Sequence, residues 1–229
     1  MKTFSQKIVA VGAGMFLAAN MAVYGVTLYD NSTTDTGNNL SLVNGTKLGN
    51  EIVMGTPSAF NTLTSFSFEI FSRQTAFNGA NVQMEVFLYA NNGAPYNTYP
   101  TPSSLLYDSG VFSLLTPWQS GFGYAATLNF DLSLTPVTVP HDFTFAVEIT
   151  GLAANDYLGM ELFDPATVGQ NSGDYWMNSG SWVLYQNSGG TRTDFGARFL
   201  GSAVPDAAST GMLLGAALAS LGFLRRKLS

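Results

Sequence analysis

The sequence predicts an all-β fold: an antiparallel, jelly-roll-like β-sandwich flanked by an N-terminal signal helix and a C-terminal transmembrane helix. Three observations lead to this prediction. Short segments in the middle of the chain alternate apolar and polar residues, which is the period of a half-buried strand. Clusters of Asn, Gly and Pro separate these segments, and none has a helical period. Finally, the two ends of the chain each combine an apolar run with basic residues.

The first 25 residues have the organisation of a secretory signal peptide. Lys2 and Lys7 precede a 12-residue run without charge, residues 8–19. Small residues follow, and Val23 and Gly25 fit the −3 and −1 positions of a cleavage site, so we expect cleavage after Gly25. An uncleaved anchor is the alternative, but 12 apolar residues are short for a membrane span.

Residues 26–203 form the predicted sandwich domain. In residues 64–71, Phe66, Phe68 and Ile70 fall on one face of a strand, and the same alternation runs through 82–89 and 143–150. Further strands are predicted at 27–30, 48–54, 105–113, 124–134, 157–163, 175–177, 182–186 and 194–200. The connection between Tyr89 and Leu105 is rich in proline and is predicted to be a surface loop.

The C-terminal 26 residues, 204–229, contain a short motif, an apolar span and a basic end. Residues 207–224 carry no charge, and a helix of that length is about 27 Å long, close to the ~30 Å of a bilayer core. The basic residues that follow are expected to stay on the cytoplasmic side and stop transfer. They are Arg225, Arg226 and Lys227.

This tail resembles the PEP-CTERM sorting signal of exported bacterial proteins. The residues that carry the resemblance are Val204, Pro205, Asp206, Ser209 and Thr210, followed by the apolar span and the basic end. The usual core of the motif is Val-Pro-Glu-Pro-Ser-Thr, so Asp206 stands where the family has Glu, and the second Pro is absent. The resemblance implies recognition by an exosortase-type membrane transpeptidase. Residues 105–110 and 162–165 also resemble the β-sandwich domains that commonly precede this signal.

Composition excludes several classes of function. The chain contains no cysteine, which excludes disulfides, thiol catalysis and cysteine-based metal sites. Only 10% of its residues are charged, against about 25% in a typical domain. Between Val26 and Pro205 there are four basic and 14 acidic residues, a net charge of −10. Such a surface cannot neutralise a run of phosphates, so we expect no nucleic-acid binding.

Few residues are suited to catalysis. The only histidine, His141, precedes Asp142 at a predicted strand start, and the chain has no Gly-x-Ser-x-Gly motif, so a serine triad is not expected. A pair of carboxylates is the one remaining device, because two of them at roughly 5–10 Å can act as the acid and base of a glycosidase. The four glutamates on the polar faces of predicted strands are Glu69, Glu85, Glu148 and Glu161. The ordinary interpretation is a solvated outer face.

Two binding hypotheses rest on aromatic and oxygen-rich segments. Trp176 and Trp182 lie in or near predicted loops and could stack on sugar rings, although tryptophan is also an ordinary sandwich core residue. Residues 164–174 are rich in oxygen ligands and could hold calcium, but they lack the spacing of an EF-hand. We expect no cofactor and no metal.

The resemblance implies an exported, non-enzymatic protein of the cell envelope or extracellular matrix. We expect it to pass through the inner membrane and to be structural or adhesive, in association with exopolysaccharide or biofilm. The alternatives are a carbohydrate-binding module and a glycan-active hydrolase that uses paired glutamates. An exposed Trp176 or Trp182 in a groove would favour the module, and two apposed glutamates in a cleft would favour the hydrolase.

Overall fold

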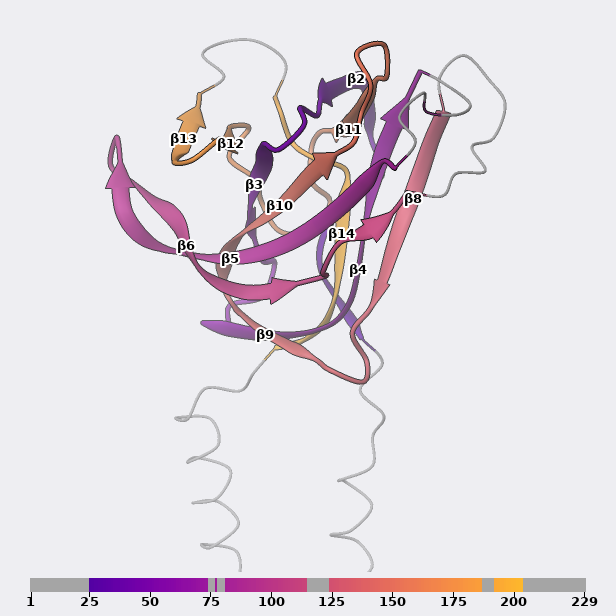
Figure 1. The fold of residues 1–229 in the computed structure, drawn as a ribbon. Helices are drawn as coiled ribbons and strands as arrows, with labels where there is room; N and C mark the ends of the chain where they lie inside the picture. The colour runs from indigo at the N-terminus through magenta and orange to yellow at the C-terminus, as the bar shows by residue number, and fades with distance from the viewer. Residues whose placement is uncertain (1–24, 74–76, 78–80, 115–123, 187–191, 204–229) are drawn as a thin grey trace, which may run out of the picture.

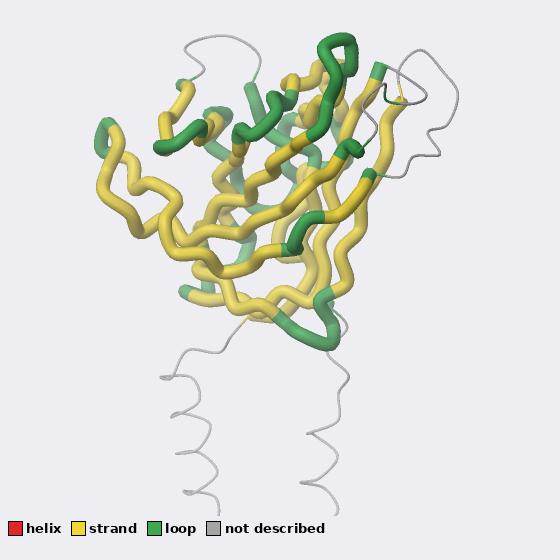
Figure 2. The backbone as a smooth tube through the Cα atoms, viewed as in Figure 1, coloured by secondary structure: helices red, strands yellow, loops and turns green. Residues whose placement is uncertain are grey.

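In the computed structural model, the described residues are 25–73, 77, 81–114, 124–186 and 192–203. They form two seven-stranded sheets, and every strand pair is antiparallel (Figures 1 and 2). The predicted all-β antiparallel fold is therefore confirmed. No helix among the described residues meets the length and hydropathy needed to cross a bilayer. Residues 1–24 of the predicted signal peptide and the whole tail, 204–229, lie outside these residues.

The first sheet, here sheet A, is organised around a long central strand. Its strands are β1 (Val26–Asn31), β14 (Ala197–Ala203), β4 (Phe60–Ser72), β11 (Leu158–Phe163), β2 (Asp35–Ser41), β8 (Tyr124–Asp131) and β9 (Val137–Pro140). One edge of β4 pairs with β14 and then β11, and its other edge pairs with β9 and then β8.

The second sheet, sheet B, is continuous from β13 to β6. Its strands are β13 (Trp182–Tyr185), β12 (Tyr175–Asn178), β3 (Lys47–Val53), β10 (Asp142–Thr150), β5 (Gln83–Tyr96), β6 (Tyr99–Asp108) and β7 (Phe112–Ser113). The tip of the β5–β6 hairpin curves away from the rest of the sheet toward β12 and β13 (Figure 1).

The core lies between the sheets and follows the predicted alternation. Phe66, Phe68 and Ile70 of β4 are at most 2% exposed, and Phe143 and Phe145 of β10 are fully buried. Aromatic rings join the layers: Phe66 lies 6.3 Å from Phe145 between ring centroids. Burial of these side chains is the main favourable contribution to the fold, at about 25 cal/mol per Å² of apolar surface.

Three details of the strand prediction were wrong. The connection from Tyr89 to Leu105, predicted to be a loop, continues β5 and β6 as a hairpin that turns at Asn97 and Thr98, whose φ angles are 47° and 78°. Proline did not end these strands because β6 lies at the sheet edge, where a missing N–H costs no ladder bond. Strands β2 and β9 were not predicted. Residues 105–113 contain two strands, because Gly110 at φ 64° breaks the run.

Candidate functional site

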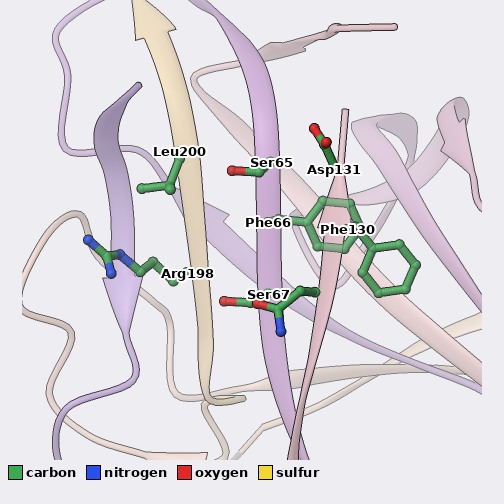
Figure 3. A pocket seen from close by; sticks show the side chains of 8 residues that line it. Ser65, Phe66, Ser67, Phe130, Asp131, Arg198 and Leu200 are labelled. Atoms are coloured by element: carbon green, nitrogen blue, oxygen red, sulfur yellow. The ribbon is translucent and has the colours of Figure 1, made fainter. Parts of the chain in front are cut away.

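The outer face of sheet A contains a shallow hollow of about 290 Å³ (Figure 3). Polar side chains from three neighbouring strands line it: Ser65 and Ser67 from β4, Asn129 and Asp131 from β8, and Arg198 from β14. The strand register explains this gathering, because Ser67 lies between Asn129 and Arg198 and Ser65 between Asp131 and Leu200. The alternation in residues 64–71 predicts only that Ser65 and Ser67 point away from the core.

The charged groups of the hollow are held by neighbours. The Arg198 guanidinium points toward β1, where Nε lies 3.5 Å from an Asp30 oxygen and Nη2 donates to Thr27 Oγ1 at 3.1 Å (Figure 3). Asp131 accepts a hydrogen bond from the Ser133 backbone N–H, which lowers the pKa of its carboxyl. Phe66, Phe130 and Leu200 supply apolar surface to the same hollow. Its hydroxyl, amide and carboxylate groups can form hydrogen bonds with a polyhydroxylated ligand.

The first pair of predicted glutamates lies farther along the same face. Glu69 on β4 and Glu161 on β11 flank Gly196, whose N–H donates to the Glu161 carbonyl and whose carbonyl accepts from the Glu69 N–H. The Phe163 ring occupies the space above Gly196, where a Cβ would collide with it. Glu161 is only 8% exposed. No basic side chain forms an ion pair with either glutamate in the described part of the chain.

Burial without a cation perturbs both carboxyls. Burial, with the nearby Asp35 and Glu69 carboxylates, raises the pKa of Glu161 to about 7. Burial and Asp35 also raise the pKa of Glu69. A carboxyl with a pKa near neutrality can donate a proton at pH 7, which is the property of a general acid. Neither glutamate lines the hollow described above.

The second pair of glutamates lies on the outer face of sheet B. Glu85 and Glu148 are direct cross-strand partners, and Glu148 is also opposite Lys47. The Lys47 ammonium is 3.7 Å from Glu148, donates to Tyr89 Oη at 3.0 Å, and lies 3.6 Å from the centre of the Phe87 ring. Partial burial and the neighbouring Asp108 carboxyl raise the pKa of Glu85. The single Lys47 charge therefore offsets only part of the negative charge of the Glu148 and Glu85 carboxyls.

The two tryptophans differ in access. Trp176 pairs with Gly49 on the outer face of sheet B but is only 1% exposed, and its ring lies 6.4 Å from Tyr96 of the β5–β6 hairpin. It offers no free ring face to a ligand. Trp182 is half-buried and lies 5.6 Å from Tyr89 in an edge-to-face arrangement. Trp118 is outside the described residues.

The oxygen-rich segment 164–174 surrounds an arginine. Arg192 Nε lies 3.3 Å from Asp164 Oδ1 and 3.1 Å from Asp194 Oδ2, and Nη2 donates to the Asn171 carbonyl at 2.8 Å. Burial raises the pKa of Asp194 to about 6, although Arg192 opposes the shift. Among the residues that the structure describes, no three acidic or histidine side chains are placed to hold a metal ion.

His141 lies between β9 and β10, where its backbone bridges Ala59 and Met54. Its Nδ1 is buried without a hydrogen-bond partner among the described residues. The sorting residues Val204 to Thr210 and the basic residues Arg225 to Lys227 lie outside the described residues. Comparison with protein-family models, curated proteins and solved structures found no match to this chain.

Proposed function

We propose that this chain is an exported, non-enzymatic β-sandwich protein that its C-terminal segment delivers to the cell envelope or extracellular matrix. Its role there is structural or adhesive, in association with exopolysaccharide. The proposal starts from the tail, whose Val204-Pro205-Asp206 motif, uncharged span and basic end resemble a PEP-CTERM signal. An exosortase-type membrane transpeptidase is the partner that this resemblance implies. We also propose that the strands of the two sheets are connected in a jelly-roll-like order.

The observation that carries the proposal is the pairing of the first and last strands. Val26 of β1 is opposite Gly201 of β14, so the first described strand begins beside the end of the last described strand (Figure 1). A domain whose export signal and anchor attach at one end can stand on a membrane with its opposite end and both outer faces free. The sandwich therefore suits display from a surface.

The same end of the sandwich exposes large apolar side chains. Val26 is 57% exposed, Phe60 54% and Leu134 95%. Strand register relates their positions: Val26 is opposite Gly201, and Gly201 and Val137 are both opposite Leu63. Phe60 lies three residues from Leu63, and Leu134 three residues from Val137, in opposite directions along the sheet, so the three side chains are spread across this end and do not form one patch. Apolar side chains are favoured at a lipid interface, which supports an orientation with this end toward the membrane.

Deletion of the tail tests the proposal. A chain that ends at Ala203 should be released as a soluble protein into the periplasm or medium, whereas the full chain should fractionate with membrane or matrix. A matched variant replaces Arg225, Arg226 and Lys227 with Gln. It keeps the apolar span and removes only the basic stop. A truncated chain that still fractionates with the membrane would show that sorting does not depend on the tail.

A carbohydrate-binding module is the second candidate, and two observations favour it. The hollow on sheet A offers Ser65, Ser67 and Asn129 to hydroxyl groups, and Trp182 with Tyr89 offers aromatic surface on sheet B. Affinity electrophoresis in gels that contain polysaccharide separates the sites. Retardation lost in Ser65→Ala/Ser67→Ala assigns binding to sheet A, and retardation lost in Trp182→Ala assigns it to sheet B.

The glutamate pair on sheet A gives a third candidate, a glycan-active hydrolase. The observation in its favour is the near-neutral pKa of Glu161 beside Glu69. Incubation with a panel of polysaccharides should give no new reducing ends. Hydrolysis that disappears in both Glu161→Gln and Glu69→Gln would replace the structural role with an enzymatic one.

A further inference from the structure

Strand β8 forms an open and regular sheet edge. It pairs with β4 over eight consecutive residues, from Ser65 opposite Asp131 to Ser72 opposite Tyr124, without a bulge. No strand of the described residues pairs with its other edge, which faces outward beyond sheet A (Figure 1). Within the described part of the chain, its backbone groups on that side have no strand partner, and such an edge is a template for another strand.

The other sheet edges carry features that block strand addition. Residues 55 and 167–168 hydrogen-bond to the edge of β1. Strand β2 has a register shift and a glycine at φ 69°, and β13 has only four residues. Strand β6 contains Pro100 and Pro102 and pairs with β5 through three register shifts. Charges, prolines, bulges and short length are the usual protection of edge strands. In β8 only one charge is present, Asp131 at its end.

The side chains of β8 leave the core unfinished at this edge. Leu128 and Phe130 point inward but are only half-buried, although the neighbouring Phe66 and Phe68 of β4 are at most 2% exposed. Phe130 stacks on Phe66 at 4.6 Å between centroids. An additional strand beside β8 would cover these half-buried rings and methyl groups, which favours its addition.

We propose that β8 of a second copy of this chain adds to β8 in antiparallel orientation, so that sheet A continues across two protomers. A two-fold axis at Leu128 keeps inward residues opposite inward residues, as a continuous sheet requires. That register places Ala126 opposite Phe130, a small residue against a large one, and Thr127 opposite Asn129. Asp131 is opposite Ala125, so no like charges face each other. The inference goes beyond the proposed function and does not depend on glycan binding.

Disulfide trapping tests the register, because the chain contains no cysteine of its own. Residues opposite each other in an antiparallel pair have Cα atoms about 4.5–5.5 Å apart, within the reach of a disulfide. In the full chain in detergent micelles under mild oxidation, Leu128→Cys should therefore form a covalent dimer. Thr127→Cys should remain a monomer, because its two copies lie on opposite sides of the axis, about 8 Å apart. Cross-linking of Thr127→Cys but not of Leu128→Cys would overturn the proposed pairing.

A second variant tests the interface without touching the core. Thr127 and Asn129 are exposed on the outer face, so Thr127→Lys/Asn129→Lys should fold normally while placing lysine opposite lysine twice across the axis. We expect the wild-type chain to sediment as a dimer and this variant as a monomer with the same far-UV circular dichroism. Ser41→Lys/Thr150→Lys, which adds equal charge at exposed positions elsewhere, should remain a dimer. A wild-type monomer, or a dimer that persists in the β8 variant, would overturn the proposal.

Discussion

The outer faces of the two sheets differ in what covers them. On sheet A the serines of β4 border an open hollow. On sheet B the β5–β6 hairpin contacts the outer face: the Tyr96 ring lies 6.4 Å from Trp176, which is only 1% exposed, and Thr144 Oγ1 donates to Asn91 Oδ1 at 2.7 Å. The comparison shows that an outward position in a strand is exposed only where no other part of the chain returns over it.

The same faces also differ in how they accommodate acidic residues. On sheet B the Lys47 ammonium lies 3.7 Å from Glu148, and its charge partly opposes the raised pKa of Glu85. Glu161 on sheet A has no cationic partner among the described residues, and burial raises its pKa to about 7. A cation lies beside a carboxylate on one face, and burial favours the protonated form of a carboxyl on the other. The stability contributions of these two carboxyls should therefore differ in their response to mutation and to pH.

The largest expected effect is at Trp176. Trp176→Ala removes a fully buried ring that the hairpin covers and should lower the free energy of unfolding by about 3–5 kcal/mol, the usual cost of truncating a buried aromatic residue. Trp182→Ala, at a half-buried position on the same face, should cost about 1–2 kcal/mol. Urea denaturation followed by circular dichroism measures both. Equal costs at the two positions would mean that the hairpin does not bury Trp176 in solution.

The next largest effect is expected at Glu161, the buried carboxyl on sheet A. Glu161→Gln keeps the shape of the side chain and removes the need to ionise it in a buried position. One pKa unit corresponds to about 1.4 kcal/mol, and partial solvent screening reduces the full shift, so we expect a gain of about 1–2 kcal/mol at pH 8. Denaturant titrations at several pH values measure the gain. Thr127→Ser, an exposed change on the same sheet, is the control.

The sign of the pH dependence follows from the raised pKa. Below pH 4.5 Glu161 is protonated in both the folded and the unfolded chain, so it costs nothing. Between pH 4.5 and about 7 the unfolded chain loses this proton first, and stability falls as the pH rises. The advantage of Glu161→Gln should therefore be absent at pH 4 and reach its maximum above pH 7. An advantage equal at pH 4 and pH 8 would contradict this account.

Sequence periodicity predicted strands well where one face is buried against the core. The alternation in 64–71, 82–89 and 143–150 appears in β4, β5 and β10 with the predicted residues inward. Periodicity did not predict β2, because its sequence Asp-Thr-Gly-Asn-Asn has the composition of a loop. This strand is kept in place by hydrogen bonds to β11 and not by burial of its side chains. Periodicity also failed for the hairpin, where prolines are tolerated at a sheet edge.

Contacts between side chains of different strands could not be predicted from the sequence. Glu69, Glu85, Glu148 and Glu161 all occupy polar positions of alternating strands, and the pattern gives them one interpretation. Only register shows that Lys47 is opposite Glu148, whereas Glu161 is opposite Asn39 beside Gly196. Burial of Trp176 likewise depends on a hairpin 80 residues earlier in the chain. Long-range pairing leaves no local signal in a single sequence.

A smaller effect is expected at the Lys47–Glu148 ion pair on sheet B. Lys47→Met keeps the packing on Phe87 but leaves Glu148 without its ion pair, which should cost about 0.5–1 kcal/mol at pH 7 and low salt. In Lys47→Met/Glu148→Gln the cost should largely disappear, because both charges are gone. Urea titrations of the wild type, the two single variants and the double variant give the coupling energy. No coupling between the two positions would show that the ion pair is absent in solution.

The smallest effect should come from metal removal, at one of the connections between the two sheets. Residues 164–174 link β11 of sheet A to β12 of sheet B, and their oxygens meet the Arg192 guanidinium, which already supplies positive charge. Thermal unfolding in EDTA and in millimolar calcium should therefore differ by less than about 1 °C. Bound metal stabilises a folded protein by mass action, so a loss of more than about 10 °C in EDTA would mean that a cation binds in addition to Arg192.

Arg192→Met is the matched variant. It should lower the melting temperature equally with and without calcium, because the Asp164 and Asp194 carboxylates then lose the cation that lies between them. Recovery of that loss by calcium alone would show that the arginine occupies a site that a metal can also fill.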